Sequence, residues 1–322
     1  MDFTNLCLVL TDKCNAECEF CCFSCSPHNS QVMPEELMIR AITEAKELGV
    51  TTVGFSGGEC FLYPALLLKG AEEARKNGLS LSVATNGFWG CWDTEKIKQF
   101  LTDLRPDFVG FSRDFFHAKY IPQESYERAC GACIELGIRC ETEIADFNGA
   151  YSAGRYLFSL GEKIYMKDCR FYAAYRAGRA LNMPKELFLT YADSEHAGCL
   201  YDGQISVFYN GDVYPCCRHE VYGSAMKLGT MKDKPLQQVV AESDVTKIGD
   251  VILNCDRMSR LVEIARTTLG YAIPEKMGCS CDFCRAIFGT KARKKEMLPY
   301  VNKLYEEMLV NAALHRNCRK ES

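Results

Sequence analysis

Residues 14–25 read Cys-Asn-Ala-Glu-Cys-Glu-Phe-Cys-Cys-Phe-Ser-Cys, and the rest of the chain is organised around them. Cys14, Cys18 and Cys21 are separated by three and two residues, so their thiolates can wrap one corner of a cubane iron–sulfur cluster. The apolar run at 6–10 predicts a short buried strand just before them. The cysteines then follow the carboxyl end of that strand, where α/β folds place their chemistry. Three thiolates would leave the fourth iron of a cluster open to a ligand.

Strand and helix patterns alternate through the first half of the chain. Apolar runs predict strands at 6–10, 51–56, 79–85, 108–112, 138–144 and 168–172. Helical spacing predicts helices at 34–48, 64–77, 93–105, 123–136 and 149–160, several of them closed by glycine or proline. Six such repeats predict an α/β fold in which a parallel sheet curves into a partial (β/α)6 barrel with right-handed crossovers. We expect this barrel to span residues 1–185.

Two of the predicted strands carry polar residues on one face. Ser112 and Asp114 share a face with Gly110 in the fourth, and Glu141 and Glu143 share a face in the fifth. A closed barrel interior is normally filled by bulky branched side chains. This pattern therefore predicts a hydrated or ligand-filled lumen. The alternative is that these groups pair with each other or meet solvent.

Composition favours a cytoplasmic enzyme that binds metal through thiolates. The chain has 20 cysteines in 322 residues, and no apolar run is long enough for a secretory signal or a membrane span. Without export a disulfide framework is not expected, which leaves metal–thiolate binding as the simplest reason for so many cysteines. The formal net charge is −4 and no basic stripe is present. We therefore expect no nucleic-acid partner and no membrane partner.

Cysteines return in the last third, after the helix–strand rhythm stops near Pro184. The Asn210-Gly211 turn between two β-prone runs predicts a hairpin. That hairpin would bring Cys199 and Cys216 towards one site, and residues 281–284 supply a Cys-x2-Cys pair. We expect a smaller domain over 186–290 and a carboxyl-terminal helix over 291–322.

The Cys-x3-Cys-x2-Cys motif in an α/β chain resembles the radical S-adenosylmethionine (SAM) superfamily. In that family the open iron chelates the amino and carboxylate groups of SAM. The resemblance implies that Gly57, Gly58 and Glu59 contact the SAM amino group. It also implies further candidates for the cofactor or substrate at the strand ends, namely Asn86, Ser112, Asp114 and Glu141 or Glu143. A structural zinc site is the alternative, because Cys22 or Cys25 could supply a fourth thiolate.

Cys199, Gly211 and Cys216 together resemble the opening of a SPASM or twitch auxiliary-cluster domain. The resemblance implies one auxiliary [4Fe–4S] cluster, held by Cys199, Cys216, Cys281 and Cys284. Cys279 could replace one of these ligands. Zinc would satisfy the same four thiolates.

Several longer stretches are similar to the YydG-type (epipeptide) radical SAM peptide epimerases; these are residues 14–27, 57–61, 86–90, 117–118, 214–217 and 281–288. The resemblance implies a 5′-deoxyadenosyl radical that removes a Cα hydrogen from an L-residue of a ribosomally made precursor peptide. Cys217 then matches the thiol that returns hydrogen from the opposite face, giving a D-residue. An electron donor of the flavodoxin or ferredoxin type is implied too. The chain departs from the pattern at Arg113 and Phe115, which bears on peptide specificity.

Two rival functions belong to other classes. A thioether-forming peptide maturase would use the same radical and an auxiliary cluster, but its product loses two hydrogens per crosslink. A non-enzymatic iron–sulfur or zinc protein would bind partners or sense redox state without cleaving SAM. Because the first strand begins by residue 6, we expect no leader-recognition domain ahead of the barrel. The peptide would bind the barrel and auxiliary domain directly, or through a separate protein.

Overall fold

A nine-stranded sheet forms the centre of the computed structural model, which describes residues 1–160, 168–192, 199, 203–216 and 221–318. Its strand order is β10-β9-β8-β1-β2-β3-β4-β5-β6. The strands are β1 (Asn5–Val9), β2 (Thr52–Ser56), β3 (Ser80–Thr85), β4 (Phe108–Ser112), β5 (Arg139–Asp146), β6 (Cys169–Ala173), β8 (Gln204–Phe208), β9 (Asp212–Tyr214) and β10 (Gly229–Thr230). A separate antiparallel pair joins β7 (Tyr191–Ala192) to β11 (Lys276–Met277).

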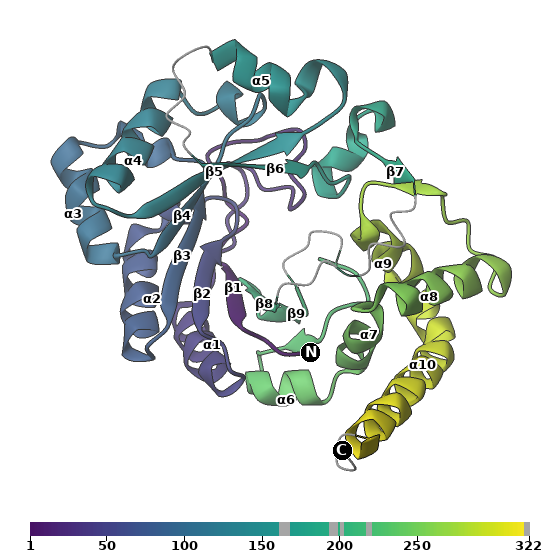
Figure 1. Ribbon diagram of the computed structural model, residues 1–322. Helices are drawn as coiled ribbons and strands as arrows, with labels where there is room; N and C mark the ends of the chain where they lie inside the picture. Colours follow the sequence, from purple (N-terminus) through teal and green to yellow (C-terminus); the bar gives the residue numbers. More distant parts are fainter. Residues whose placement is uncertain (161–167, 193–198, 200–202, 217–220, 319–322) are drawn as a thin grey trace.

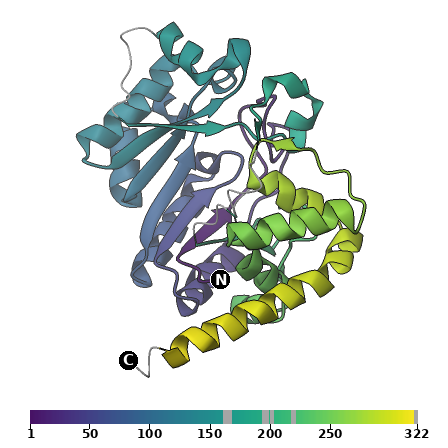
Figure 2. The same ribbon diagram turned by 45° about the vertical axis from the view of Figure 1, so that its right-hand side comes forward.

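The helices fall into two groups. The first group alternates with the strands and comprises α1 (Glu35–Glu47), α2 (Pro64–Lys76), α3 (Thr94–Leu104), α4 (Gln123–Glu135) and α5 (Ala153–Leu160). The second group follows the hairpin and comprises α6 (Leu236–Ala241), α7 (Asp244–Ile252), α8 (Cys255–Thr267), α9 (Ser280–Phe288) and α10 (Lys291–Cys318). Figure 1 shows the first group around the outside of the curved sheet and the second group on the side of the sheet where β8 and β9 lie. Figure 2 shows α10 running along the outside of the second group.

Local sequence explains where these elements begin and end, as α3 illustrates. The Asp93 carboxylate accepts a hydrogen bond from the backbone N–H of Glu95 at 3.0 Å, which caps the first turn. The helix ends at Arg105, whose φ of 49° is left-handed, directly before Pro106. Its apolar face, at Ile97, Phe100, Leu101 and Leu104, is buried. Spacing of three and four residues along a helix puts these side chains on one stripe.

The six predicted strands are confirmed as the parallel strands β1 to β6, each paired with the next. In β1 the four residues after Asn5 are all buried, because both faces of the sheet are covered there. At the other end, β6 exposes Arg170 and Phe171. This is the α/β partial barrel that the hydrophobic pattern predicts.

The predicted hairpin forms, but it does not stand apart from the barrel sheet. Ser206 pairs with Tyr214 across the antiparallel β8–β9 pair. Strand β8 also pairs in parallel with β1, from Asn5 with Gln204 to Val9 with Phe208. The sheet is thus continuous from the barrel into the region that we expected to form a second domain. Within the described residues, no helix is both long enough and apolar enough to cross a membrane.

Candidate active site

A cavity of about 440 Å³ opens at the carboxyl ends of the parallel strands. This volume is in the range of small-molecule and cofactor sites. Its wall includes eight of the residues that the sequence singles out: Cys14, Cys18, Cys21, Gly57, Gly58, Asn86, Ser112 and Glu143. The fold therefore brings the cysteine loop and the ends of β2 to β5 to one place.

The cysteine loop presents its first thiol to polar neighbours inside this cavity. The backbone N–H of Ala16 lies 3.4 Å from Cys14 Sγ, and the Asn86 side-chain amide lies 3.9 Å from the same sulfur. Cys14 is 9% exposed and Cys18 is 6% exposed. Burial raises the pKa of the Cys14 thiol to about 12 and also raises that of Cys18. Donors aimed at a sulfur stabilise a metal-bound thiolate and tune the potential of a cluster.

Cys21 and Cys25 form a second thiol contact in the same loop. A hydrogen bond from Cys25 lowers the pKa of the Cys21 thiol, and the same contact raises the pKa of Cys25. Cys25 is buried, and both Cys22 and Cys25 line the cavity. Thiols beyond the three predicted cluster cysteines are therefore present in the same loop.

The donor set fits a cubane cluster better than a single ion. Within the described residues, no three Cys, His, Asp or Glu side chains form a group that could hold a metal ion. In a cubane each cysteine binds a different iron, so its ligands stand further apart than those of one ion. Three thiols on one cavity wall, with N–H donors beside Cys14, agree with that wider arrangement.

Gly57 and Gly58 bring the end of β2 against the backbone of the cysteine loop. A Cβ at Gly58 would lie 2.1 Å from the carbonyl oxygen of Lys13, and one at Gly57 would lie 2.6 Å from that of Thr11. Gly57 also has a φ of 140°, which side chains rarely adopt. The Gly58 N–H donates to Thr11 O at 2.7 Å. Glycine is needed here for close approach to the loop, in addition to the predicted approach to a cofactor.

Glu59, which we expected to meet the SAM ammonium group, follows Gly58 directly but does not itself line the cavity. Its side chain is 1% exposed, and it is absent from the cavity wall. The carboxylate accepts from the N–H of Phe61 at 3.1 Å, the hydroxyl of Thr85 at 2.9 Å and the N–H of Asn86 at 2.8 Å. Burial raises the pKa of this carboxyl to about 7, against the opposing effect of these donors. Glu59 thus ties the ends of β2 and β3 together.

The remaining predicted strand-end residues separate into two sets. Asn86, Ser112 and Glu143 line the cavity, which supports the predicted polar lumen. Asp114 and Glu141 do not line it. Asp114 is buried and its carboxylate lies 2.8 Å from Nδ1 of His117, whose ring does line the cavity. His117 lies three residues after Asp114 in the sequence, and that spacing was the available signal for the pair.

Arg113 and Phe115, where the chain departs from the epimerase pattern, point elsewhere. The Arg113 guanidinium donates to Ile121 O and to Gln123 Oε1, each at 2.7 Å, and the residue is 2% exposed. The Phe115 ring packs against Tyr156, with centroids 5.1 Å apart. Neither residue lines the cavity. Their difference from the pattern therefore reflects local packing.

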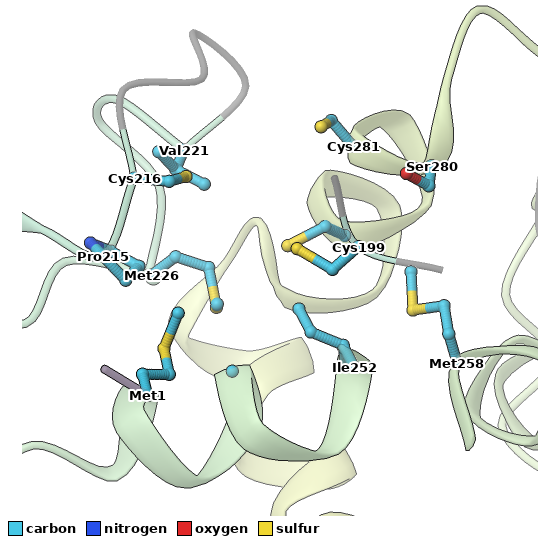
Figure 3. A pocket seen from close by; sticks show the side chains of 12 residues that line it. Met1, Cys199, Pro215, Cys216, Val221, Met226, Ile252, Met258, Ser280 and Cys281 are labelled. Carbon is cyan, nitrogen blue, oxygen red and sulfur yellow. The ribbon is translucent and has the colours of Figure 1, made fainter. Parts of the chain in front are cut away.

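The four expected auxiliary ligands line one smaller, apolar pocket. Cys199, Cys216, Cys281 and Cys284 all contribute to its wall, with Met1, Met226 and Met258 among their neighbours. Figure 3 shows Cys199, Cys216 and Cys281 around this space, on separate segments of the chain. Thiols from distant segments thus line one small space, which is the donor type that a second iron–sulfur cluster needs.

Cys279 has a different place from these four. It does not line the pocket and instead caps the first turn of α9, where its N–H donates to Asp282 Oδ2 at 3.3 Å. This placement favours Cys281 and Cys284 as the pair that faces the pocket. Cys217, the expected hydrogen donor, lies outside the described residues.

Two family models match separate parts of the chain. Residues 8–149 match the Radical SAM superfamily, and residues 199–263 match SPASM, an iron–sulfur cluster-binding domain. A curated relative, the "putative peptide biosynthesis protein YydG" of Bacillus subtilis (strain 168), is 24% identical over 314 residues, which are 92% of this chain and 96% of the relative.

Solved structures share the fold at low identity. The structure of anSMEcpe with bound AdoMet and the Cp18Cys peptide has a TM-score of 0.57 at 16% identity, over 95% of this chain and 99% of that one. The structure of Streptococcus suis SuiB bound to its precursor peptide SuiA also has a TM-score of 0.57, at 14% identity. That match covers 76% of this chain and 66% of the SuiB chain.

Proposed function

We propose that this chain, a radical SAM enzyme that binds SAM, a [4Fe–4S] cluster and auxiliary iron–sulfur, modifies a ribosomally made peptide. The observation that carries the proposal is the cavity of about 440 Å³, whose wall is formed by the cysteine loop and by polar residues at the strand ends. A relative described as a peptide biosynthesis protein matches almost the whole chain. Two structural neighbours are titled as peptide complexes.

The two pockets support the ligand assignments that we propose. We assign Cys14, Cys18 and Cys21 to the cluster that binds SAM, and Gly57, Gly58, Asn86, Ser112 and Glu143 to the wall around it. We assign Cys199, Cys216, Cys281 and Cys284 to the auxiliary cluster. The proposed divisions are 1–185 for the barrel, 186–290 for the auxiliary part and 291–322 for the last helix.

The finer proposal is epimerisation of L-residues to D-residues. A cluster held by Cys14, Cys18 and Cys21 would pass one electron from the external donor to bound SAM, and the S–C bond cleavage would give methionine and a 5′-deoxyadenosyl radical able to remove the Cα hydrogen of the substrate residue. The Cα centre then flattens, so its configuration depends on the face from which hydrogen returns. Cys217 donates the hydrogen atom of its S–H bond to the opposite face. An electron from a flavodoxin- or ferredoxin-type donor, with a proton from solvent, then restores the thiol.

The cavity residues have defined tasks in this scheme. Ser112 and Glu143 present polar groups to the bound molecules from neighbouring strands, β4 and β5. His117, held by Asp114 at 2.8 Å, presents its ring beside the cysteine loop, where it lies 5.5 Å from the Phe20 ring. Phe20 and Phe23 also line the cavity and limit the access of water. Exclusion of water protects a radical from side reactions.

A comparison of Cys217→Ala with wild type tests the proposal. The assay uses reconstituted enzyme, a peptide encoded beside this gene, and deuterated water. We expect wild type to yield D-residues that carry one solvent deuterium each. We expect Cys217→Ala still to cleave SAM but to yield no inverted product. Cys255→Ala is the matched control, because Cys255 is exposed and lies outside both pockets.

Each other outcome points to a different conclusion. Normal inversion by Cys217→Ala would show that another group returns the hydrogen. A wild-type product lighter by two hydrogens, with no deuterium, would identify thioether formation instead. A peptide left unchanged under conditions of rapid SAM cleavage would count against a peptide substrate encoded nearby.

A further inference from the structure

One residue far along the chain binds the cysteine loop at three points. Arg179 lies in the 3₁₀ turn Gly178–Asn182, which follows β6. Its Nε donates to the carbonyl oxygen of Cys18 at 2.9 Å, and its Nη2 donates to that of Cys25 at 2.7 Å. Its backbone N–H donates to the carbonyl oxygen of Cys21 at 3.0 Å. These three carbonyls belong to residues spread along the loop that carries the cluster ligands.

Gly178, the residue before Arg179, also packs closely against the cysteine loop. Gly178 has a φ of 57°, and a Cβ there would lie 2.1 Å from the carbonyl oxygen of Cys22. Side chains are disfavoured by both the conformation and the space. The backbone of Gly178 thus packs directly on the loop. The contact is a built interface rather than the reach of one long side chain.

The loop itself holds a conformation that is costly to adopt. Ser24 has a φ of 54°, which is unusual for a residue other than glycine, asparagine or aspartate. Its N–H donates to Cys21 O at 3.1 Å, which closes a tight turn between the third cluster cysteine and Cys25. Unfavourable backbone conformations persist when surrounding contacts over-determine them. The Arg179 bonds to Cys21 O and Cys25 O bracket this turn.

The Arg179 side chain also brings a positive charge to the cysteine loop, because its Nε and Nη2 donate to the carbonyl oxygens of Cys18 and Cys25. Its nearest carboxylate is Glu17, at 3.6 Å, whose side chain is 47% exposed, whereas the Arg179 side chain is 21% exposed. A solvated partner screens a half-buried guanidinium only in part. The guanidinium therefore keeps a positive charge close to the cysteine loop, where buried carboxylates such as Glu59 and Asp114 supply only negative charge.

We propose that Arg179 is a positioning residue for the SAM-binding cluster. Its planar guanidinium, with two N–H donors, fixes the cysteine loop, and its positive charge favours reduction of the cluster. The two tasks can be separated by a lysine, which keeps the positive charge but cannot place two N–H donors as the planar guanidinium does. Added electrons make a cluster more negative, so loss of a nearby positive charge disfavours reduction. The inference rests on the proposed ligands Cys14, Cys18 and Cys21, and does not depend on which reaction the peptide undergoes.

The test compares Arg179→Met and Arg179→Lys with wild type after anaerobic reconstitution. One readout is a redox titration of the cluster whose electron paramagnetic resonance signal changes when SAM is added. The other is the rate at which a chelator removes iron. The control is Arg128→Met, because Arg128 Nη2 also donates to a backbone carbonyl, that of Trp92 at 2.7 Å, outside the cavity.

We expect Arg179→Met to make one-electron reduction about tenfold less favourable, which corresponds to about 59 mV. Iron should also leave about tenfold faster. Arg179→Lys should keep the wild-type reduction potential but still lose iron faster, since only the guanidinium hydrogen bonds to the loop carbonyls are lost. Arg128→Met should match wild type in both readouts. An unchanged potential and an unchanged iron-release rate in Arg179→Met would overturn the inference.

A Cys14→Ser variant separates failure of this inference from failure of the ligand assignment. If Cys14→Ser keeps the SAM-sensitive signal unaltered, the ligand assignment is wrong and the inference falls with it. If Cys14→Ser changes or abolishes that signal while Arg179→Met leaves potential and iron release unchanged, only the role of Arg179 is refuted. Loss of fold is monitored by the thermal midpoint, which should differ little between Arg179→Lys and wild type.

Discussion

Gly58→Ala is the sharpest test of how the cysteine loop is held. The added Cβ would lie 2.1 Å from Lys13 O, 2.5 Å from Lys13 C and 3.1 Å from Cys14 N. All three atoms belong to the backbone, so no rotation of a side chain can relieve the contact. The loop must move away from the end of β2. Gly58 has no left-handed φ, and the perturbation is therefore one of space alone.

The cost can be worked from the contacts that the movement would disturb. Overpacking a close-packed site costs about 1–3 kcal/mol. The loop is also joined to this turn by the Gly58 N–H to Thr11 O bond at 2.7 Å and the Glu59 N–H to Lys13 O bond at 2.9 Å. Each such bond contributes about 0.5–1.5 kcal/mol. We expect Gly58→Ala to destabilise the protein by about 2–6 kcal/mol if both bonds are lost.

The assay is thermal unfolding of the apoprotein together with iron content after reconstitution. We expect a fall in Tm of at least about 4 °C, since 1 kcal/mol corresponds to about 2–4 °C in a large domain. Iron should fall from about eight per chain towards four, because a [4Fe–4S] cluster is lost at one site and kept at the other. Gly131→Ala in α4 is the control, because a Cβ there meets nothing within 4 Å. It should stabilise the protein by about 0.5–1 kcal/mol.

A Gly58→Ala protein with the Tm of wild type and a full SAM-binding cluster would refute the steric argument. Equal destabilisation by Gly131→Ala would refute it as well, because alanine itself would then be the cause. If Tm falls but both clusters load fully, the loop tolerates the movement, and the close approach of β2 serves stability alone.

Three further predictions concern the auxiliary pocket, the His117 contact and the buried Arg113. Cys281→Ser should lose about half of the iron and keep the SAM-sensitive cluster signal, as iron analysis and paramagnetic resonance would show; loss of that signal would contradict separate sites. Burial lowers the pKa of His117, but the Asp114 carboxylate outweighs it and the net pKa is raised, so apoprotein stability from this pair is full below pH 6.5 and is lost as pH rises through the raised value. Denaturant titrations of His117→Gln should therefore show its largest deficit at low pH, and a deficit that grows with pH would be contrary to this account. Arg113→Met should cost about 1–3 kcal/mol through the unpaired carbonyl of Ile121, with SAM affinity unaltered by calorimetry; a weakened affinity would place Arg113 at the cofactor.

Local patterns in the sequence were enough for the barrel and for the loop that carries Cys14, Cys18 and Cys21. Strand and helix periods are set by neighbouring residues, which is why all six parallel strands were expected within about two residues of their observed bounds. The spacing of Cys14, Cys18 and Cys21 is likewise local. The Asn210-Gly211 turn predicted the hairpin for the same reason.

Side-chain partners were less accessible, as Glu59 and Asp114 illustrate. The sequence placed both at a strand end, which is correct, and expected both at the cofactor. In the structure neither residue lines the cavity: Glu59 accepts hydrogen bonds from Thr85 and Asn86 at the end of the next strand, and Asp114 holds His117. A strand end fixes the position of a residue in the sheet, but the neighbours that pack around it decide where its carboxylate points.

The sequence by itself determined the repeating α/β architecture, the cysteine loop and the convergence of chemistry at the strand ends. Only the tertiary structure decided that β8 joins β1. It also decided that Arg179 binds the carbonyl of Cys18 across 161 positions of sequence. The physical reason is the range of the interactions. Backbone conformation follows adjacent residues, whereas a hydrogen bond or a close packing contact depends on which segments the whole fold brings together.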